Sequence, residues 1–192
     1  RKCQHVTAEA FSKLVNEKGA DNAKLLMVGA RYIRQHEIEY IEKVKNTLKE
    51  GGVEDRAQIL DIQSEVLKYY MAADVVLVPS KNEVLPLVIA EAQAFQCPLV
   101  VTNIDGLPEA VTDGQEGFLV PPEDAQALAD AIDKFHKDSD LAVRTGALGR
   151  VRALHQFSHK TMRERYEEII DEMAPPADKM LQRLLGGPGG EG

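Results

Sequence analysis

Short apolar runs alternate with amphipathic segments along the first 120 residues, and this alternation constrains the fold most. The run from Leu25 to Val28 is continuous and ends on glycine, a pattern typical of a strand buried on both faces of a parallel sheet. Strands that alternate with helices need right-handed crossovers, which predicts a doubly wound parallel α/β fold. The expected strands cover residues 24–29, 57–62, 74–80, 97–102 and 117–120, and the expected helices cover residues 6–18, 36–49, 64–73, 86–95, 106–111, 123–136, 141–155 and 158–173.

Charge and composition exclude several function classes. The chain has 192 residues with 23 Lys and Arg against 31 Asp and Glu, a net charge of −8 that opposes binding to nucleic acid. Its longest apolar runs fall far short of the roughly 20 residues that cross a bilayer. Two cysteines, Cys3 and Cys97, are too few for a disulfide scaffold, and no signal-peptide pattern opens the chain. We therefore expect a cytoplasmic protein without a transmembrane segment.

The length predicts one core domain, which we place at residues 1–173. Residues 174–192 contain two adjacent prolines and a glycine-rich end, which cannot bury a core, so we expect a flexible tail. The chain opens almost at once on a helical pattern and does not begin with methionine. We expect it to be a piece of a longer polypeptide.

Two carboxylates flank the start of the helix that follows the apolar run at 75–78. Glu83 precedes Pro86 and should lie in a loop, whereas Glu91 lies within the helix. Loops at the carboxyl ends of parallel strands are where open α/β sheets bind ligands, and a helix start presents unpaired N–H groups to anions. A diphosphate could rest there, while the carboxylates accept hydrogen bonds from sugar hydroxyls. Taken alone, their spacing favours the alternative that both glutamates are solvated surface charges, because isolated carboxylates usually face solvent.

A longer stretch resembles a known family. The segments that carry the resemblance are Leu26–Gly29, Tyr70–Val75, Pro79–Ala92, Pro98–Thr102, Asp105–Val111, Gly117–Pro121 and the helix from Asp124 to Ile132. Together they resemble the C-terminal, donor-binding half of a family 4 (group 1) retaining glycosyltransferase. The resemblance spans nearly all of residues 1–173 and implies the Rossmann-like half of a GT-B fold.

The resemblance also implies roles for individual residues. Glu83 matches the first glutamate of the family's paired-glutamate motif, which touches the transferred sugar and is our catalytic candidate. Glu91 matches the second glutamate, which binds the nucleotide ribose, and Lys2 matches a phosphate-binding lysine. The family needs neither a metal ion nor a cofactor, because the nucleotide-diphosphate sugar is a substrate. The backbone of three further residues should face the donor phosphates: Val84, Leu85 and Leu87.

The family places the acceptor in an N-terminal domain of the same polypeptide. The resemblance therefore implies that the full-length protein transfers a hexose from a nucleotide sugar, and that this chain alone is inactive. It also implies that the first strand of the domain, with a basic residue at its end, precedes residue 1.

Three departures from the family pattern support a second hypothesis, a catalytically inactive glycosyltransferase-like domain with a structural or regulatory role. Gln96 and Asp105 stand where the family usually has glycine, and no glycine follows the strand that ends near Asp61. An acidic Asp105 close to a diphosphate would repel it. A third hypothesis, a stand-alone nucleotide-binding module, has support only from the fold.

Other candidate sites are weaker. Gly29 lies at the end of a predicted strand, as the first glycine of a phosphate-binding loop would. The second and third glycines of that motif are missing, which favours a simple turn at the end of the strand. His155 and His159 are four residues apart and could bind a metal ion, although Ser158 is expected to cap a new helix between them. The apolar face that begins at Met162 could meet a partner or pack in the core.

Overall fold

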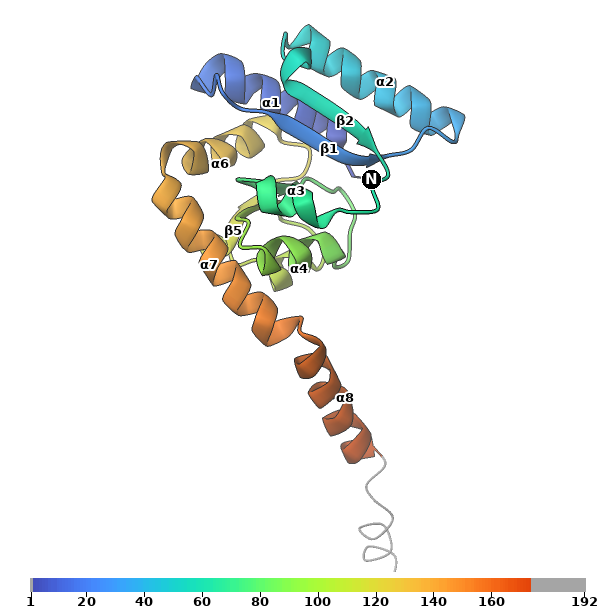
Figure 1. Cartoon of the computed structure of the whole chain (residues 1–192), viewed down its shortest axis with the longest axis vertical. Coiled ribbons are helices and arrows are strands. Elements are labelled where there is room, and N and C mark those ends of the chain that lie inside the picture. Colours follow the sequence, from blue (N-terminus) through green and yellow to red (C-terminus); the bar gives the residue numbers. More distant parts are fainter. Residues whose placement is uncertain (1, 174–192) are drawn as a thin grey trace, which may run out of the picture. The chain divides into compact units, whose positions relative to one another are not determined.

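All strands of the described chain pair in parallel. The computed structural model describes residues 2–173. In it, β1 (Leu25–Ala30) pairs with β2 (Ala57–Asp61), and β3 (Val76–Val78), β4 (Leu99–Thr102) and β5 (Gly117–Val120) form a second group in the order β3-β4-β5 (Figure 1). The α/β class with parallel sheets that the sequence predicts is confirmed.

Helices connect the strands. Residues up to Ala153 form one compact unit and residues from Leu154 onward a second, and we describe each by itself. The helices are α1 (Gln4–Lys18), α2 (Gln35–Glu50), α3 (Leu67–Ala72), α4 (Leu87–Ala94), α5 (Leu107–Ala110), α6 (Ala125–Lys137), α7 (Ser139–Gln156) and α8 (His159–Met173), and a single 3-10 turn, η1 (Glu54–Arg56), precedes β2.

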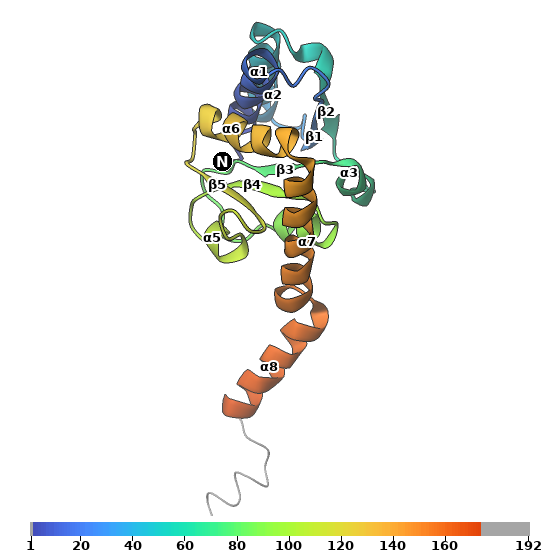
Figure 2. The ribbon, with the colours of Figure 1, turned by 90° about the vertical axis from the view of Figure 1, so that its left-hand side faces the viewer.

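Helix α1 joins the two strand groups, because two of its faces are buried in different clusters. One face, with Val6 and Ala10, packs in a cluster that includes Val100 of β4 and residues of α6, which runs along β4 and β5 (Figure 2). Another face packs with Leu25 of β1 and with α2. The members of that second cluster that α1 contributes are Ala8, Phe11, Leu14 and Val15.

Helix α4 ends in a turn with a left-handed residue, a position that glycine usually occupies but that Gln96 occupies here. The N–H of Cys97 donates to the Ala92 carbonyl at 2.9 Å and the N–H of Gln96 to the Gln93 carbonyl at 3.0 Å, the paired bonds of a Schellman motif. Gln96 has φ 59°. Helix α7 packs directly on this turn, since a Cβ built on Gly146 would lie 1.9 Å from the Gln96 carbonyl oxygen.

An ion pair also fixes α7 to α5 and to the segment between α5 and β5. Arg152 lies 3.2 Å from Glu116, and their side chains are 16% and 9% exposed. Arg152 also donates to the Glu109 carbonyl at 2.5 Å and to the Thr112 hydroxyl at 2.9 Å. A charge pair with this many hydrogen bonds is costly to break, because either partner alone would be left buried.

Three expectations about the elements need correction, and one is confirmed. Burial of β1 on both faces is wrong: Leu26 and Val28 are 45% and 39% exposed, because only the opposite face of the strand packs against α1 and α2. The predicted helix 64–73 begins only at Leu67 and the predicted strand 74–80 is only three residues long. Ser158 caps α8 as predicted, since its hydroxyl accepts the Thr161 N–H at 3.1 Å. The predicted tail at 174–192 lies outside the described residues.

Candidate functional site

The loop between β3 and α4 carries the first predicted glutamate. Glu83 lies in this loop and Glu91 in α4, as the sequence predicts. Pro86 is the residue just before the helix rather than part of its first turn. The start of the loop is fixed from β4, because the Thr102 hydroxyl donates to the Ser80 carbonyl at 2.5 Å.

Glu83 is brought together with Lys2, 81 residues away in the sequence. The Lys2 ammonium forms an ion pair and hydrogen bond with the Glu83 carboxylate. The side chain of Glu83 is 11% exposed and that of Lys2 is 50% exposed. A largely buried carboxylate therefore sits beside a solvent-accessible ammonium, a pair that can offer opposite charges to a polar ligand.

Asp105 holds the backbone of the same loop. Its Oδ2 accepts a hydrogen bond from the Glu83 N–H at 3.1 Å. The neighbouring Gly106 packs so closely on the loop that an added Cβ would lie 2.3 Å from the Val84 carbonyl oxygen. The acidic side chain that the sequence marks as a departure is thus engaged by the backbone of the candidate site.

Glu91 has a partner that the sequence did not reveal. The Tyr70 hydroxyl donates to Glu91 Oε2 at 2.6 Å, and the Tyr70 ring stacks on Phe95 with 5.8 Å between centroids. Burial, followed by the hydrogen bond to Glu91, raises the pKa of Tyr70 well above its usual value. Tyr70 therefore remains a protonated donor at neutral pH and orients the Glu91 carboxylate. The helical spacing of Tyr70 in the sequence indicates an inward-facing side chain but gives no sign of this partner.

The start of α4 presents backbone N–H groups beneath exposed apolar side chains. Val84, Leu85 and Leu87 are 78%, 48% and 77% exposed. The Ile89 N–H donates to the Pro86 carbonyl at 3.1 Å, whereas the N–H groups of the first helical residues have no acceptor within a helix. The arrangement is compatible with an anion at the helix start, as the sequence predicts for this segment.

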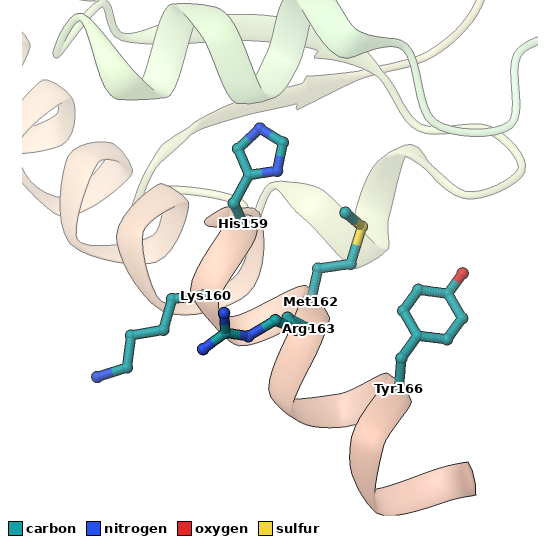
Figure 3. A pocket seen from close by; sticks show the side chains of 5 residues that line it. All are labelled: His159, Lys160, Met162, Arg163 and Tyr166. Atoms are coloured by element: carbon teal, nitrogen blue, oxygen red, sulfur yellow. The ribbon is translucent and has the colours of Figure 1, made fainter.

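The other candidates are not assembled into sites. Within residues 2–173, no three His, Cys, Asp or Glu side chains are grouped so that they could hold a metal ion. His155 lies in the last turn of α7 and His159 begins α8, on either side of the Ser158 cap. A hollow is lined by His159, Lys160, Met162, Arg163 and Tyr166, but all five belong to α8 alone, and Lys160 points away from Met162 and Tyr166 (Figure 3). No helix in the described part of the chain is long and apolar enough to cross a membrane.

Comparisons with known proteins identify relatives over most of the chain. The model of the family described as "Glycosyl transferases group 1" matches residues 1–152. The chain is 30% identical over 171 residues to the D-inositol 3-phosphate glycosyltransferase of Corynebacterium diphtheriae, covering 88% of this chain and 39% of that protein. It is 31% identical over 161 residues to the N-acetyl-alpha-D-glucosaminyl L-malate synthase of Bacillus anthracis, covering 84% and 40%. The chain thus spans about two fifths of the length of these curated relatives.

Solved structures show the same fold. The sucrose-phosphate synthase of Thermosynechococcus elongatus superposes with a TM-score of 0.79 at 28% identity, over 90% of this chain and 42% of the synthase. Anabaena HepE in complex with UDP superposes with a TM-score of 0.81 at 24% identity, over 89% of this chain and 45% of HepE. Both likenesses extend over most of this chain and less than half of the other protein.

Proposed function

The chain belongs to the group 1 glycosyltransferase family and has the architecture of the C-terminal half of a GT-B fold, and from that premise we propose that it binds the nucleotide-sugar donor of a retaining hexosyltransferase. The observation that carries the proposal is the Lys2–Glu83 pair in the loop that follows β3. Ligands of open parallel sheets bind at the carboxyl ends of the strands, which is where this pair lies.

The chemistry of the pair fits the two parts of a nucleotide sugar. The Lys2 ammonium is accessible to a diphosphate and would neutralise the charge that develops on it as the sugar departs. The Glu83 carboxylate can accept hydrogen bonds from hydroxyls of the transferred sugar. We assign Glu83 the catalytic role on this basis.

Two further elements complete the proposed donor site. Glu91, held by Tyr70, would accept hydrogen bonds from the ribose hydroxyls. The backbone at Val84, Leu85 and Leu87 would face the phosphates at the start of α4. The proposal requires no metal ion or cofactor, because Lys2 and the helix start supply the positive potential.

The acceptor site is proposed to lie in another part of the same polypeptide. The relatives are more than twice as long as the region that this chain matches. In the described residues, β1 is an edge strand of one parallel group and β3 is an edge strand of the other. We propose that a strand preceding residue 1 pairs with them and that an N-terminal domain binds the acceptor, so that this chain alone does not turn over.

Calorimetric titration tests the donor site. UDP, GDP and ADP and their hexose conjugates are titrated into this chain and into a longer polypeptide. We expect one nucleotide to bind with a millimolar or lower dissociation constant, about −4 kcal/mol or stronger. Replacing Glu91 with Ala should weaken that binding by about 1–3 kcal/mol, roughly 5- to 150-fold, through loss of the ribose hydrogen bonds.

Glu17→Ala is the matched control, because Glu17 is an exposed carboxylate on α1 whose ion pair with Lys13 is 3.5 Å long. It should leave nucleotide affinity unchanged. Equal affinities of the wild type and Glu91→Ala would remove Glu91 from the site. Absence of binding to the longer polypeptide would reject the donor-binding proposal and favour a structural or regulatory domain.

A further inference from the structure

The last residue of β4 and the loop after it contact the loop after β3 at three points. The Thr102 hydroxyl donates to the Ser80 carbonyl at 2.5 Å, and the Asp105 carboxylate accepts the Glu83 N–H at 3.1 Å. Gly106 then lies against the Val84 carbonyl, with no room for a Cβ. The three contacts hold the loop after β3 at Ser80, Glu83 and Val84, so that Glu83 lies between two other attached residues.

We propose that Asp105 is a positioning residue of the donor site, whose carboxylate fixes the backbone of Glu83 and thereby aims the Glu83 side chain at Lys2 and the donor sugar. This inference rests on the proposed function of Glu83. It assigns to Asp105 the opposite of the effect expected from its charge alone, which is repulsion of a diphosphate.

The burial of Glu83 gives the hydrogen bond its importance. Glu83 as a whole is 8% exposed, so a lost acceptor on its N–H is poorly replaced by water. A carboxylate is also a stronger acceptor than a neutral carbonyl, because the bond is charge-assisted. Without this bond, the loop between Ser80 and Val84 would lose a backbone attachment at Glu83, and the Glu83 carboxylate would be oriented less tightly by its own side-chain contacts, such as the pair with Lys2.

The backbone at Asp105 explains why this residue type can replace a glycine. Its φ is 45°, in the left-handed region where Asp and Asn are tolerated better than most other residues. Asp105→Asn keeps this tolerance and an acceptor oxygen but removes the charge. Asp105→Gly keeps the backbone conformation and removes both the acceptor and the charge. The two variants therefore separate positioning from repulsion.

Amide hydrogen exchange of Glu83, measured by NMR on this chain, is the direct test. Asp105→Gly should speed exchange of the Glu83 N–H at least tenfold, whereas Asp105→Asn should change it by less than threefold. Asp113→Gly is the matched control, because the Asp113 carboxylate accepts the Leu119 N–H at 2.9 Å in another part of the domain. It should leave exchange at Glu83 unchanged.

Titration with UDP-glucose, GDP-mannose and ADP-glucose, each beside its free nucleotide, adds the functional readout. For whichever conjugate the wild type binds, Asp105→Gly should lower its affinity about fivefold or more and change the affinity of the free nucleotide by less than twofold. That split follows from Glu83 contacting the sugar, and a general loss of stability would not produce it.

Two results overturn the inference. Equal exchange at Glu83 in the wild type and Asp105→Gly would show that the carboxylate does not hold the loop. Tighter binding of the conjugate to both Asp105 variants would show that repulsion dominates. If no conjugate binds to the wild type, the donor-site proposal fails for this chain, but the exchange experiment still decides whether Asp105 positions Glu83.

Discussion

Replacing Gly146 with Ala should destabilise the domain, although alanine is the better helix former. Gly146 lies in α7, and a Cβ there would lie 1.9 Å from the Gln96 carbonyl oxygen. Ordinary van der Waals contact begins at 3.4 Å, so the overlap is about 1.5 Å. The obstructing atom belongs to the backbone of a turn that two hydrogen bonds hold, at Gln96 and Cys97, and it cannot swing aside as a side chain does.

Two terms of opposite sign decide the magnitude. Gly→Ala inside a helix gains about 1 kcal/mol from propensity. Overpacking against backbone costs about 3 kcal/mol, the upper end of the usual range, because α7 must move away from α4 as a whole. The free energy of unfolding should fall by about 2 kcal/mol, which lowers Tm by about 4–8 °C in a protein of this size.

Urea denaturation followed by circular dichroism measures the change, and Gly149→Ala is the matched control in the same helix. A Cβ at position 149 would meet the Gln93 side chain at 3.2 Å, an overlap of only about 0.2 Å against about 1.5 Å at position 146. Gly149→Ala should therefore be as stable as the wild type or more stable, by up to about 1 kcal/mol. If Gly146→Ala proves as stable as Gly149→Ala, α7 does not pack on the Gln96 turn as described.

Two further predictions concern the surroundings of α4. Gln96→Gly should raise the free energy of unfolding by about 0.5–1 kcal/mol, because glycine adopts φ 59° at this Schellman turn without strain. Gln96→Ala should not raise it, and equal urea midpoints for the two variants would contradict the prediction. Burial and the bond to Glu91 raise the pKa of Tyr70 in the folded state above the value of about 10 that it has in the unfolded chain. The protonated phenol therefore contributes its full stabilisation below about pH 10, and this contribution is lost as the pH rises above that value. Unfolding free energies measured from pH 9 to 11 should fall more steeply for the wild type than for Tyr70→Phe, and parallel curves would count against the Tyr70–Glu91 bond.

Strong periodicity was enough to predict the longer elements. Helix α2 spans Gln35–Glu50 against a predicted 36–49, because its apolar stripe and the following glycines mark both ends. Strand β5 spans Gly117–Val120, as predicted. Strand β3 is shorter than its apolar run, since hydrogen-bonded pairing with β4, rather than composition, determines where a strand ends. Burial of β1 on both faces could not be judged from its run, because burial depends on what packs against each face.

The site was only partly predictable for a similar reason. The loop position of Glu83 followed from Pro86 and the preceding strand, but spacing alone could not pair Glu83 with Lys2 across 81 residues. The family resemblance assigned both residues to the donor site, but their ion pair was not predicted. The contacts of Tyr70 with Glu91 and of Asp105 with Glu83 span 21 and 22 residues and form only when separate loops and helices close on one another. Local sequence patterns do not predict such bonds.

Gln96 and Asp105 replace glycines, and the structure changes what those replacements mean. Both residues keep positive φ, 59° and 45°, so the backbone retains a conformation that their side chains disfavour. A glycine packs closely at or beside each turn: Gly146 lies against the Gln96 carbonyl, and Gly106 lies against the carbonyl of Val84, next to Glu83. At Gln96 the turn is also held by the local hydrogen bonds of Gln96 and Cys97. The same contacts hold α4 and the Glu83 loop in place, so the two replacements are not evidence that the proposed donor site has lost its geometry.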